Sequence, residues 1–291
     1  MEQRRQDRQP YADGEEHHPA IISRIDASTR VERLLGGSLY RIEAFHPRVG
    51  RLDGLRILHL SDLHFNGRTP AKHLAALAAA LRKERFDLVA LTGDVLDHGD
   101  DPWSAEERAF LKGLRAKHGK FAVLGNHDYG RVRQPERARH FLRLAGFAEL
   151  TNKTVKVAGL RLVGLDDPLG GRPDAEAFPD VKKEEFVLLL VHSLDALNAT
   201  TPKALDLVLW GHIHAGECRF LGLDSVDWML LRGHFKNMNR HRGPAPWKFL
   251  TERTLSYINP GFHSTLHQFY GVPRFGTRRE GVALLTLRKY P

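Results

Sequence analysis

Short apolar runs recur along the chain, and each early one is followed by polar side chains and then by a helical pattern. The first apolar segment, residues 39–49, alternates apolar and polar positions, which is typical of a strand at the edge of a sheet. Three short, largely apolar runs follow, at 56–60, 87–91 and 121–124. This rhythm predicts strands that alternate with helices.

Three helices are predicted, one after each of these runs. They are expected at about 70–81, from 102 onward, and at 135–144. A proline stands at each start, where its fixed backbone angle suits the first turn. Apolar side chains at helical spacing are predicted to face the core, namely Leu74, Leu77, Leu81, Phe110, Leu111, Leu114, Phe141 and Leu142.

The second half of the chain predicts a mixed sheet. Residues 153–164 indicate a hairpin that turns at Ala158 and Gly159. Further strands are expected at 186–191, 205–210, 254–259 and 281–290. We interpret residues 37–291 as one domain with an insertion at about 222–253, where no clean period is found, and residues 1–36 as a peripheral N-terminal tail.

Composition and charge narrow the class of partner. The 291 residues carry a formal net charge of +9, which favours phosphorylated substrates, nucleic acid or an acidic lipid surface. The single cysteine, Cys218, excludes an intramolecular disulfide. No apolar run approaches the roughly 20 residues that span a bilayer, and the first 30 residues lack the apolar centre of a signal peptide. We expect a cytoplasmic protein without a transmembrane segment, with peripheral attachment to the inner membrane left open.

Five polar clusters each follow directly on a predicted strand. Ligand sites in open α/β sheets collect at the carboxyl ends of the strands, so we expect these clusters to converge. Their members are Asp62 and His64, Asp94, Asn126 with His127, His192, and His212 with His214. Carboxylate, amide and imidazole groups suit a borderline divalent metal, so the sequence predicts a metal centre.

The spacing within the clusters favours two metal ions. Residues i and i+2 of an extended chain point the same way, so Asp62 and His64 can approach one point, as can His212 and His214. We expect Asp94 to bridge two ions about 4 Å apart, an arrangement in which the ions lower the pKa of a shared water. Mn²⁺ is the expected metal; Fe²⁺ and Zn²⁺ also suit a shell of His, Asp and Asn, and Mg²⁺ suits it less.

In their order along the chain, the clusters resemble the signature of the calcineurin-like metallophosphoesterase superfamily, which is D-x-H, G-D, G-N-H-[DE], H and G-H-x-H. The resemblance implies a four-layer α/β/β/α sandwich with mixed sheets. It implies that His127 contacts the phosphate as an acid or an electrostatic stabiliser, without being a ligand. The ligand sets that it implies are Asp62, His64, Asp94 and His214 for one ion, and Asp94, Asn126, His192 and His212 for the other.

Segments 125–130, 164–168 and 274–276 are similar to the YkuE-type branch of this superfamily. That branch is similar to the chlamydial type of UDP-2,3-diacylglucosamine pyrophosphatase, an enzyme of lipid A synthesis. The chain has Asp97-His98-Gly99 where serine/threonine phosphatases of the superfamily have Asp-Arg-Gly, which argues against that class. Segment 211–217 departs from the Gly-His-Thr-His-Gly-Gly-Gln of many branch members, so the substrate stays open.

Three features have alternative interpretations. The insertion interleaves Trp228, Trp247 and other apolar residues with basic ones, which suits an anionic membrane surface or a lid over acyl chains; alternatively, its apolar residues complete the core. Asp166 and Asp167 either form a turn or support the metal shell from a second layer. A run of arginines either binds a substrate phosphate or lies on a solvated helix face: Arg131, Arg133, Arg137, Arg139 and Arg143.

We therefore expect a metal-dependent phosphoesterase that hydrolyses a phosphodiester or pyrophosphate bond. Its substrate would be a phosphorylated small molecule or a lipid-linked one such as UDP-2,3-diacylglucosamine. A broad phosphodiesterase acting on nucleotides or nucleic acid is the alternative that the positive charge favours. A non-catalytic scaffold of the same fold is disfavoured because no member of the signature is missing.

Overall fold

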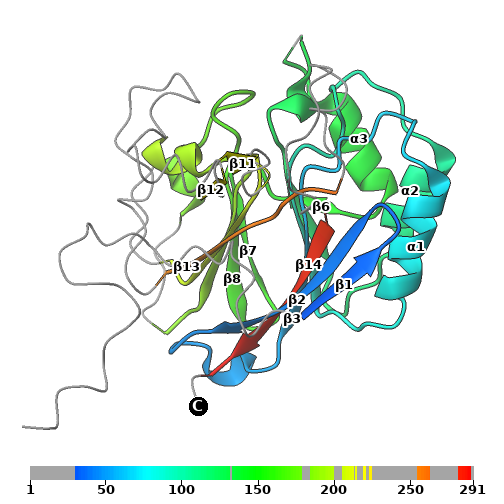
Figure 1. Cartoon of the computed structure of the whole chain (residues 1–291). Helices are drawn as coiled ribbons and strands as arrows, with labels where there is room; N and C mark the ends of the chain where they lie inside the picture. Colours follow the sequence, from blue (N-terminus) through cyan, green and yellow to red (C-terminus); the bar gives the residue numbers. More distant parts are fainter. Residues whose placement is uncertain are drawn as a thin grey trace, which may run out of the picture.

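Two β-sheets lie face to face in the computed structural model of the chain, and three α-helices cover the outer face of one of them (Figure 1). The structure describes residues 30–131, 133–178, 184–199, 205–212, 214, 219–220, 223–224, 254–262 and 281–289. Both sheets contain parallel and antiparallel pairs, so the predicted α/β class with mixed sheets is confirmed.

The larger sheet has seven strands in the order β1-β2-β14-β3-β4-β5-β6. Their bounds are Arg30–Leu34 for β1, Gly37–Phe45 for β2, Gly281–Arg288 for β14, Arg56–Leu60 for β3, Leu88–Thr92 for β4, Lys120–Val123 for β5 and Ala148–Glu149 for β6. Strands β3 to β6 run parallel, whereas β14 is antiparallel to β3. The carboxyl ends of β3, β4 and β5 therefore lie along one edge.

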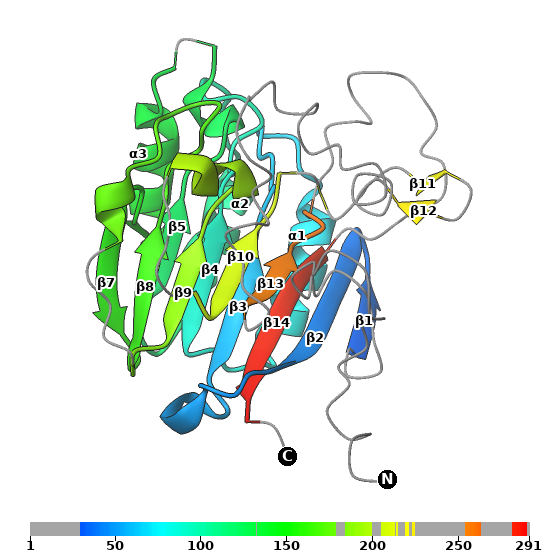
Figure 2. The same cartoon turned by 90° about the vertical axis from the view of Figure 1, so that its left-hand side faces the viewer.

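The smaller sheet has five strands in the order β13-β10-β9-β8-β7, and Figure 2 views it from its outer side. Their bounds are Leu255–Ile258 for β13, Leu207–Trp210 for β10, Val187–Leu190 for β9, Leu160–Gly164 for β8 and Lys153–Val157 for β7. The first four are parallel, and β7 and β8 form the predicted antiparallel hairpin. A separate antiparallel pair joins β11 (Arg219–Phe220) to β12 (Leu223–Asp224).

The helices are α1 (Ala71–Leu81), α2 (Ala105–Gly113) and α3 (Glu136–Leu144), and the apolar side chains predicted to face the core are buried in each. Helix α2 begins later than the expected start at Pro102. The Ser104 side chain accepts a hydrogen bond from the Glu107 N–H while the Glu107 carboxylate accepts one from the Ser104 N–H, a reciprocal cap that fixes the start. Among the described residues, no helix is long and apolar enough to cross a membrane.

Apolar side chains from both sheets fill the space between them. The larger sheet contributes Ile57, Leu88 and Val123, and the smaller sheet contributes Leu188 and Leu209. All five side chains are buried, so this apolar layer holds the two sheets together. A second cluster packs the three helices onto the outer face of the larger sheet.

The outer face of the smaller sheet is covered by short 3₁₀ turns in the described part of the chain, where the four-layer sandwich implied α-helices. Two 3₁₀ helices lie there, η3 (Ala175–Ala177) and η4 (Leu194–Ala199), whereas η1 (Gly50–Leu52) and η2 (His127–Tyr129) pack elsewhere. Leu194 and Leu197 of η4 pack with Val187 and Leu189 of β9 and with Trp210 of β10. These contacts form the fourth layer as far as the structure describes it.

The sequence-based boundaries need two corrections at the N-terminal side. Residues 30–34, assigned to the tail, form β1 and pair with β2. Strand β2, expected at an edge, lies inside the sheet because β14 pairs with its other side. The rest of the tail and nearly all of the insertion at 222–253 lie outside the described residues.

Candidate metal centre

The eight residues predicted for the site lie on loops that follow five parallel strands. Three of these strands, β3, β4 and β5, belong to the larger sheet, and two, β9 and β10, belong to the smaller one. Direct contacts link all eight residues into one cluster, so the predicted convergence is found: Asp62, His64, Asp94, Asn126, His127, His192, His212 and His214.

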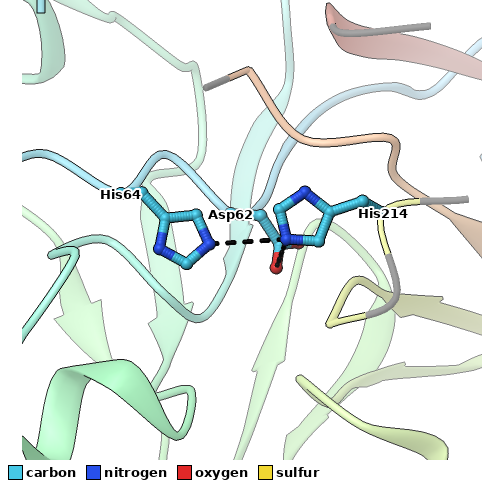
Figure 3. A group of neighbouring side chains, drawn as sticks. All are labelled: Asp62, His64 and His214. Atoms are coloured by element: carbon cyan, nitrogen blue, oxygen red, sulfur yellow. Dashed lines mark hydrogen bonds and ion pairs between the residues drawn. The ribbon is translucent and has the colours of Figure 1, made fainter. Parts of the chain in front are cut away.

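A first group of converging side chains consists of Asp62, His64 and His214 (Figure 3). His214 Nε2 lies 3.3 Å from Asp62 Oδ1 and 3.4 Å from His64 Nε2. The two imidazole rings are nearly parallel, with 10° between their planes. Two ring nitrogens and a carboxylate oxygen thus face one point, which is a donor set that divalent transition metals prefer.

A second group consists of Asp94, His192 and His212. His192 Nε2 lies 3.1 Å from Asp94 Oδ2 and 3.2 Å from His212 Nδ1. The amide oxygen of Asn126 adds a fourth donor, 3.1 Å from the same His192 nitrogen. The ring of His192 is held from behind, because its Nδ1 donates a hydrogen bond to the Thr92 carbonyl at 2.8 Å.

Asp94 stands between the two groups. Its Oδ2 lies 3.1 Å from His192 Nε2 and 3.8 Å from His64 Nε2, so the same oxygen faces an imidazole of each group. Its Oδ1 accepts a hydrogen bond of 2.8 Å from the His127 N–H, which fixes the carboxylate. Asp94 therefore occupies the position that the predicted bridge between two ions requires.

Left-handed backbone conformations are concentrated at these residues. In the described part of the chain, five of the eight non-glycine residues with positive φ are predicted ligands: Asp62 (51°), His64 (45°), Asp94 (49°), His212 (66°) and His214 (49°). Such conformations cost on the order of 1 kcal/mol or more each and persist where the surroundings impose them, often at functional sites. The fold thus tolerates strain here to aim these side chains inward.

Two glycines make room for the carboxylates. A Cβ on Gly125 would lie 2.2 Å from Asp94 Oδ1, and a Cβ on Gly211 would lie 2.1 Å from Asp62 Oδ2. Any side chain at either position would displace a predicted ligand. The glycines that precede Asn126 and His212 in the sequence are therefore explained by close packing against carboxylates on the loops after β4 and β3.

Charges within the cluster act strongly on one another. Burial raises the pKa of Asp94, but the charges of His192 and His127 outweigh burial and hold that pKa well below its usual range. Burial lowers the pKa of His192, and Asp94 reverses this effect and raises the pKa well above its ordinary value. The buried carboxylate thus depends on nearby positive charge, which a bound cation supplies. The donor set and this charge balance fit a pair of divalent cations.

His127 lies beside the first group. Its ring centroid is 4.8 Å from that of His64, with the rings nearly perpendicular at 86°. Its Nδ1 donates a hydrogen bond to the carbonyl oxygen of Asp97. Burial lowers the pKa of His127, but Asp94 and the bond to Asp97 outweigh burial and raise it. The surroundings of His127, beside the predicted ion pair, therefore favour the protonated form of its imidazole.

Asp97 belongs to the site although the sequence analysis gave it no role there. Its Oδ1 lies 3.5 Å from His64 Nδ1, and its Oδ2 accepts a hydrogen bond of 3.2 Å from Asn66 Nδ2. Asp97, His64 and His127 also form a group that could hold a metal. The sequence did contain a signal for this role, because Asp97 follows Asp94 by three residues on the same loop.

Two of the basic residues considered for phosphate binding make structural contacts. The Arg137 guanidinium lies 4.7 Å above the Trp103 ring and donates a hydrogen bond to the Asp101 carbonyl. Arg139 pairs with Glu136 one helical turn away. For these two residues the contacts favour the helix-face interpretation. Cys218 and the segment 274–276 lie outside the described residues.

One family model covers all eight predicted residues of this site. The family model described as calcineurin-like phosphoesterase matches residues 55–216. That range is more than half of the chain, and it contains all eight predicted site residues. The part of the chain before residue 55 and the strands after 216 lie beyond the matched range.

Several relatives are similar over a large part of the chain. The metallophosphoesterase YkuE of Bacillus subtilis is 30% identical over 57% of this chain, and the match spans 60% of YkuE. A metallophosphoesterase of Aquifex aeolicus is 30% identical over 67% of this chain and 75% of its own length. The UDP-2,3-diacylglucosamine pyrophosphatase LpxG of Chlamydia muridarum is 38% identical, with coverages of 74% and 79%.

Proposed function

The chain belongs to the calcineurin-like phosphoesterase family, and on that premise we propose that it hydrolyses a phosphodiester or pyrophosphate bond at a centre of two divalent cations. The observation that carries the proposal is the position of Asp94, whose Oδ2 faces one imidazole of each ligand group. One group of donors would hold a single ion; two groups that share a carboxylate fit a pair.

The two ions would be held by the ligand sets expected from the sequence. The first ion would be bound by Asp62, His64, Asp94 and His214. The second would be bound by Asp94, Asn126, His192 and His212. When bound, the ions supply Lewis acidity, which lowers the pKa of a water and draws charge from the phosphoryl oxygens. Mn²⁺ is the metal that we propose, because imidazole, amide and carboxylate ligands suit it better than they suit Mg²⁺.

His127 would hold the proton that the leaving oxygen needs. The bond from its Nδ1 to the Asp97 carbonyl orients the ring and leaves Nε2 to exchange a proton with the substrate. Asp94 supports the charged form of the ring, since it raises the pKa of His127 against the effect of burial. A positively charged imidazole would also stabilise negative charge on the phosphate.

The substrate that we propose is UDP-2,3-diacylglucosamine, cleaved by water to UMP and 2,3-diacylglucosamine 1-phosphate. Two chlamydial LpxG proteins, named as UDP-2,3-diacylglucosamine pyrophosphatases, are 38% and 37% identical to this chain over 74% of its length. The net charge of +9 suits an anionic substrate and an acidic lipid surface. A lipid-linked substrate would place the enzyme at the cytoplasmic face of the inner membrane.

The second candidate is a phosphodiesterase of broad specificity that accepts nucleotides or nucleic acid. The observation that favours it is the same excess of positive charge, which attracts a phosphate backbone without regard to sequence. It predicts strand cleavage with a steep dependence on salt.

The test compares three substrates with the Mn²⁺-loaded full chain. We expect turnover of bis-p-nitrophenyl phosphate and release of UMP from UDP-2,3-diacylglucosamine, with little cleavage of single-stranded DNA. Cleavage of DNA in preference to the sugar nucleotide would support the second candidate. Absence of turnover on all three substrates with Mn²⁺, Fe²⁺ and Zn²⁺ would overturn the hydrolase proposal.

A further inference from the structure

Asp167 lies at the same edge of the smaller sheet as two predicted ligands. It follows β8, while His192 follows β9 and His212 follows β10. These three strands are parallel neighbours, with Gly164 opposite Leu190 and Leu190 opposite Leu209. The register therefore brings the three polar residues to neighbouring strand ends, beside the second ligand group.

The carboxylate of Asp167 is fully buried, and only one of its two oxygens accepts hydrogen bonds from described residues. Its Oδ1 accepts hydrogen bonds from the N–H groups of Leu169 at 2.8 Å and Gly170 at 2.9 Å. Its Oδ2 is buried as well and accepts no hydrogen bond from any residue that the structure describes. A buried acceptor left unpaired is unfavourable, and more so when it is charged. A donor for this oxygen is therefore needed.

The turn that carries Asp167 is held by its own set of hydrogen bonds. The hydroxyl of Tyr129 donates to Asp166 Oδ1, which also accepts from the Asp167 N–H at 2.9 Å. Asp166 Oδ2 accepts from the Arg172 N–H at 2.8 Å, and Asn152 Oδ1 accepts from the Asp166 N–H at 3.0 Å. These bonds give the buried carboxylate a fixed place in the fold. Asp166 thus makes the turn, and Asp167 is left for another role.

The imidazoles of His192 and His212 influence the pKa of Asp167 through their charge. Burial raises the pKa of the Asp167 carboxyl, and the charges of His192 and His212 act in the opposite direction. His192 already has a partner behind it, because its Nδ1 donates to the Thr92 carbonyl. His212 turns its Nδ1 to the second group, 3.2 Å from His192 Nε2. Histidines that bind a metal through one nitrogen usually donate the other ring N–H to a carboxylate or carbonyl.

We propose that Asp167 is a positioning residue of the second ion site, and that in the ion-bound protein the unpaired Oδ2 accepts the ring N–H of His212 on the side away from the ion. This bond would fix the tautomer in which His212 Nδ1 carries no proton and is ready to bind the cation. The inference rests on the proposed two-metal centre. Of the two roles considered for this pair from the sequence, Asp166 would form the turn and Asp167 would support a metal ligand.

The test is a calorimetric titration of the metal-free full chain with Mn²⁺, before and after Asp167→Asn. The amide keeps the acceptor for Leu169 and Gly170 but can place a donor where Oδ2 was. We expect the affinity for one of the two ions to fall about 10- to 100-fold, the usual effect of losing such a partner. The control is Asp206→Asn, a buried carboxylate at the opposite end of β10 that accepts the Val187 N–H. This control should lower stability and leave both affinities unchanged.

A measurement on the unmodified chain covers the case in which Asp167→Asn does not fold. In the Zn²⁺-loaded protein labelled with ¹⁵N-histidine, we expect a slowly exchanging, downfield ring N–H signal that disappears in His212→Asn. Wild-type affinity for both ions in Asp167→Asn, or the absence of that ring signal, would overturn this inference alone. Failure of the wild-type chain to bind any ion would overturn the proposed function together with it.

Discussion

The carboxylate of Asp94 and the imidazole of His192 approach to 3.1 Å, and both side chains are buried. Asp94 follows β4 of the larger sheet and His192 follows β9 of the smaller one, so this contact joins the two sheets at the site. A Cβ on Gly93 would lie 2.7 Å from His192 Nδ1, which shows how closely the two loops are packed. The candidate centre therefore depends on the packing of one sheet against the other.

Replacing Asp94 by alanine should remove both ions at once, because its carboxylate faces both ligand groups. We expect turnover of bis-p-nitrophenyl phosphate to fall by about 10³-fold or more, since several kcal/mol of charge stabilisation is lost. Metal analysis after gel filtration should show less than one ion per chain. Retention of two ions in Asp94→Ala would refute the bridging position.

Replacing His127 by alanine should separate proton transfer from metal binding. We expect kcat to fall by about 10²- to 10⁴-fold, the usual contribution of a positioned acid, with the metal content unchanged. His118→Ala is the matched control, because His118 is exposed and lies on a loop before β5, away from the ligand groups. A loss of metal in His127→Ala would mean that His127 is a ligand and has no separate role as an acid.

Replacing Gly211 by alanine should damage the first ion site through packing alone. The added Cβ would meet Ser61 Oγ at 2.0 Å and Asp62 Oδ2 at 2.1 Å, so the Asp62 carboxylate must move. We expect weaker binding of one ion and a loss of about 1–3 kcal/mol in the free energy of unfolding.

Gly113→Ala is the control for this change, since a Cβ there meets nothing within 4 Å. It should leave metal binding unchanged and leave stability equal or slightly higher. Equal behaviour of the two variants would show that the close approach at Gly211 has no functional consequence.

Replacing Glu84 by glutamine should destabilise the fold in a way that depends on pH. Burial raises the pKa of Glu84, but hydrogen bonds from Arg41 and Arg56 outweigh burial and lower it below its ordinary 4.5. Because its pKa is lowered in the folded state, the ionised Glu84 carboxylate stabilises the fold fully above pH 4.5. This stabilisation is lost as the pH falls through the pKa that Glu84 has in the folded protein.

We therefore expect Glu84→Gln to lose about 1–2 kcal/mol in urea unfolding at pH 7, and this deficit to shrink as the solution is acidified. Glu84 lies at the end of the sheet away from the ligand loops, next to the start of β3. Metal binding should therefore be unaffected. A deficit that grows at low pH would contradict the assignment of an ionised Glu84.

The strands and the site residues could be predicted because local patterns specify them. Short, largely apolar runs mark β3, β4, β5, β9 and β10, and a polar cluster follows each of them. The parallel direction of these strands then brings the clusters to one edge. The position of Asp94 between two groups could be predicted for the same reason, since its strand β4 lies between β3 and β5 in the larger sheet.

Features that depend on contacts between distant segments could not be predicted in this way. Strand β1 carries charged and exposed side chains and resembles a tail until its pairing with β2 is known. The interior place of β2 depends on β14, which comes from the far end of the chain. The roles of Asp97 and Asp167 depend on which side chains their oxygens meet, and spacing along the sequence does not reveal that.

The most direct measurement of the central claim is anomalous diffraction from crystals of the full chain grown with Mn²⁺. The account predicts two anomalous peaks about 3.5–4 Å apart, the usual separation in two-metal sites, with the Asp94 carboxylate between them. One peak should contact His64 and His214, and the other His192 and His212. A single peak, no peak at these loops, or two peaks without Asp94 between them would contradict it.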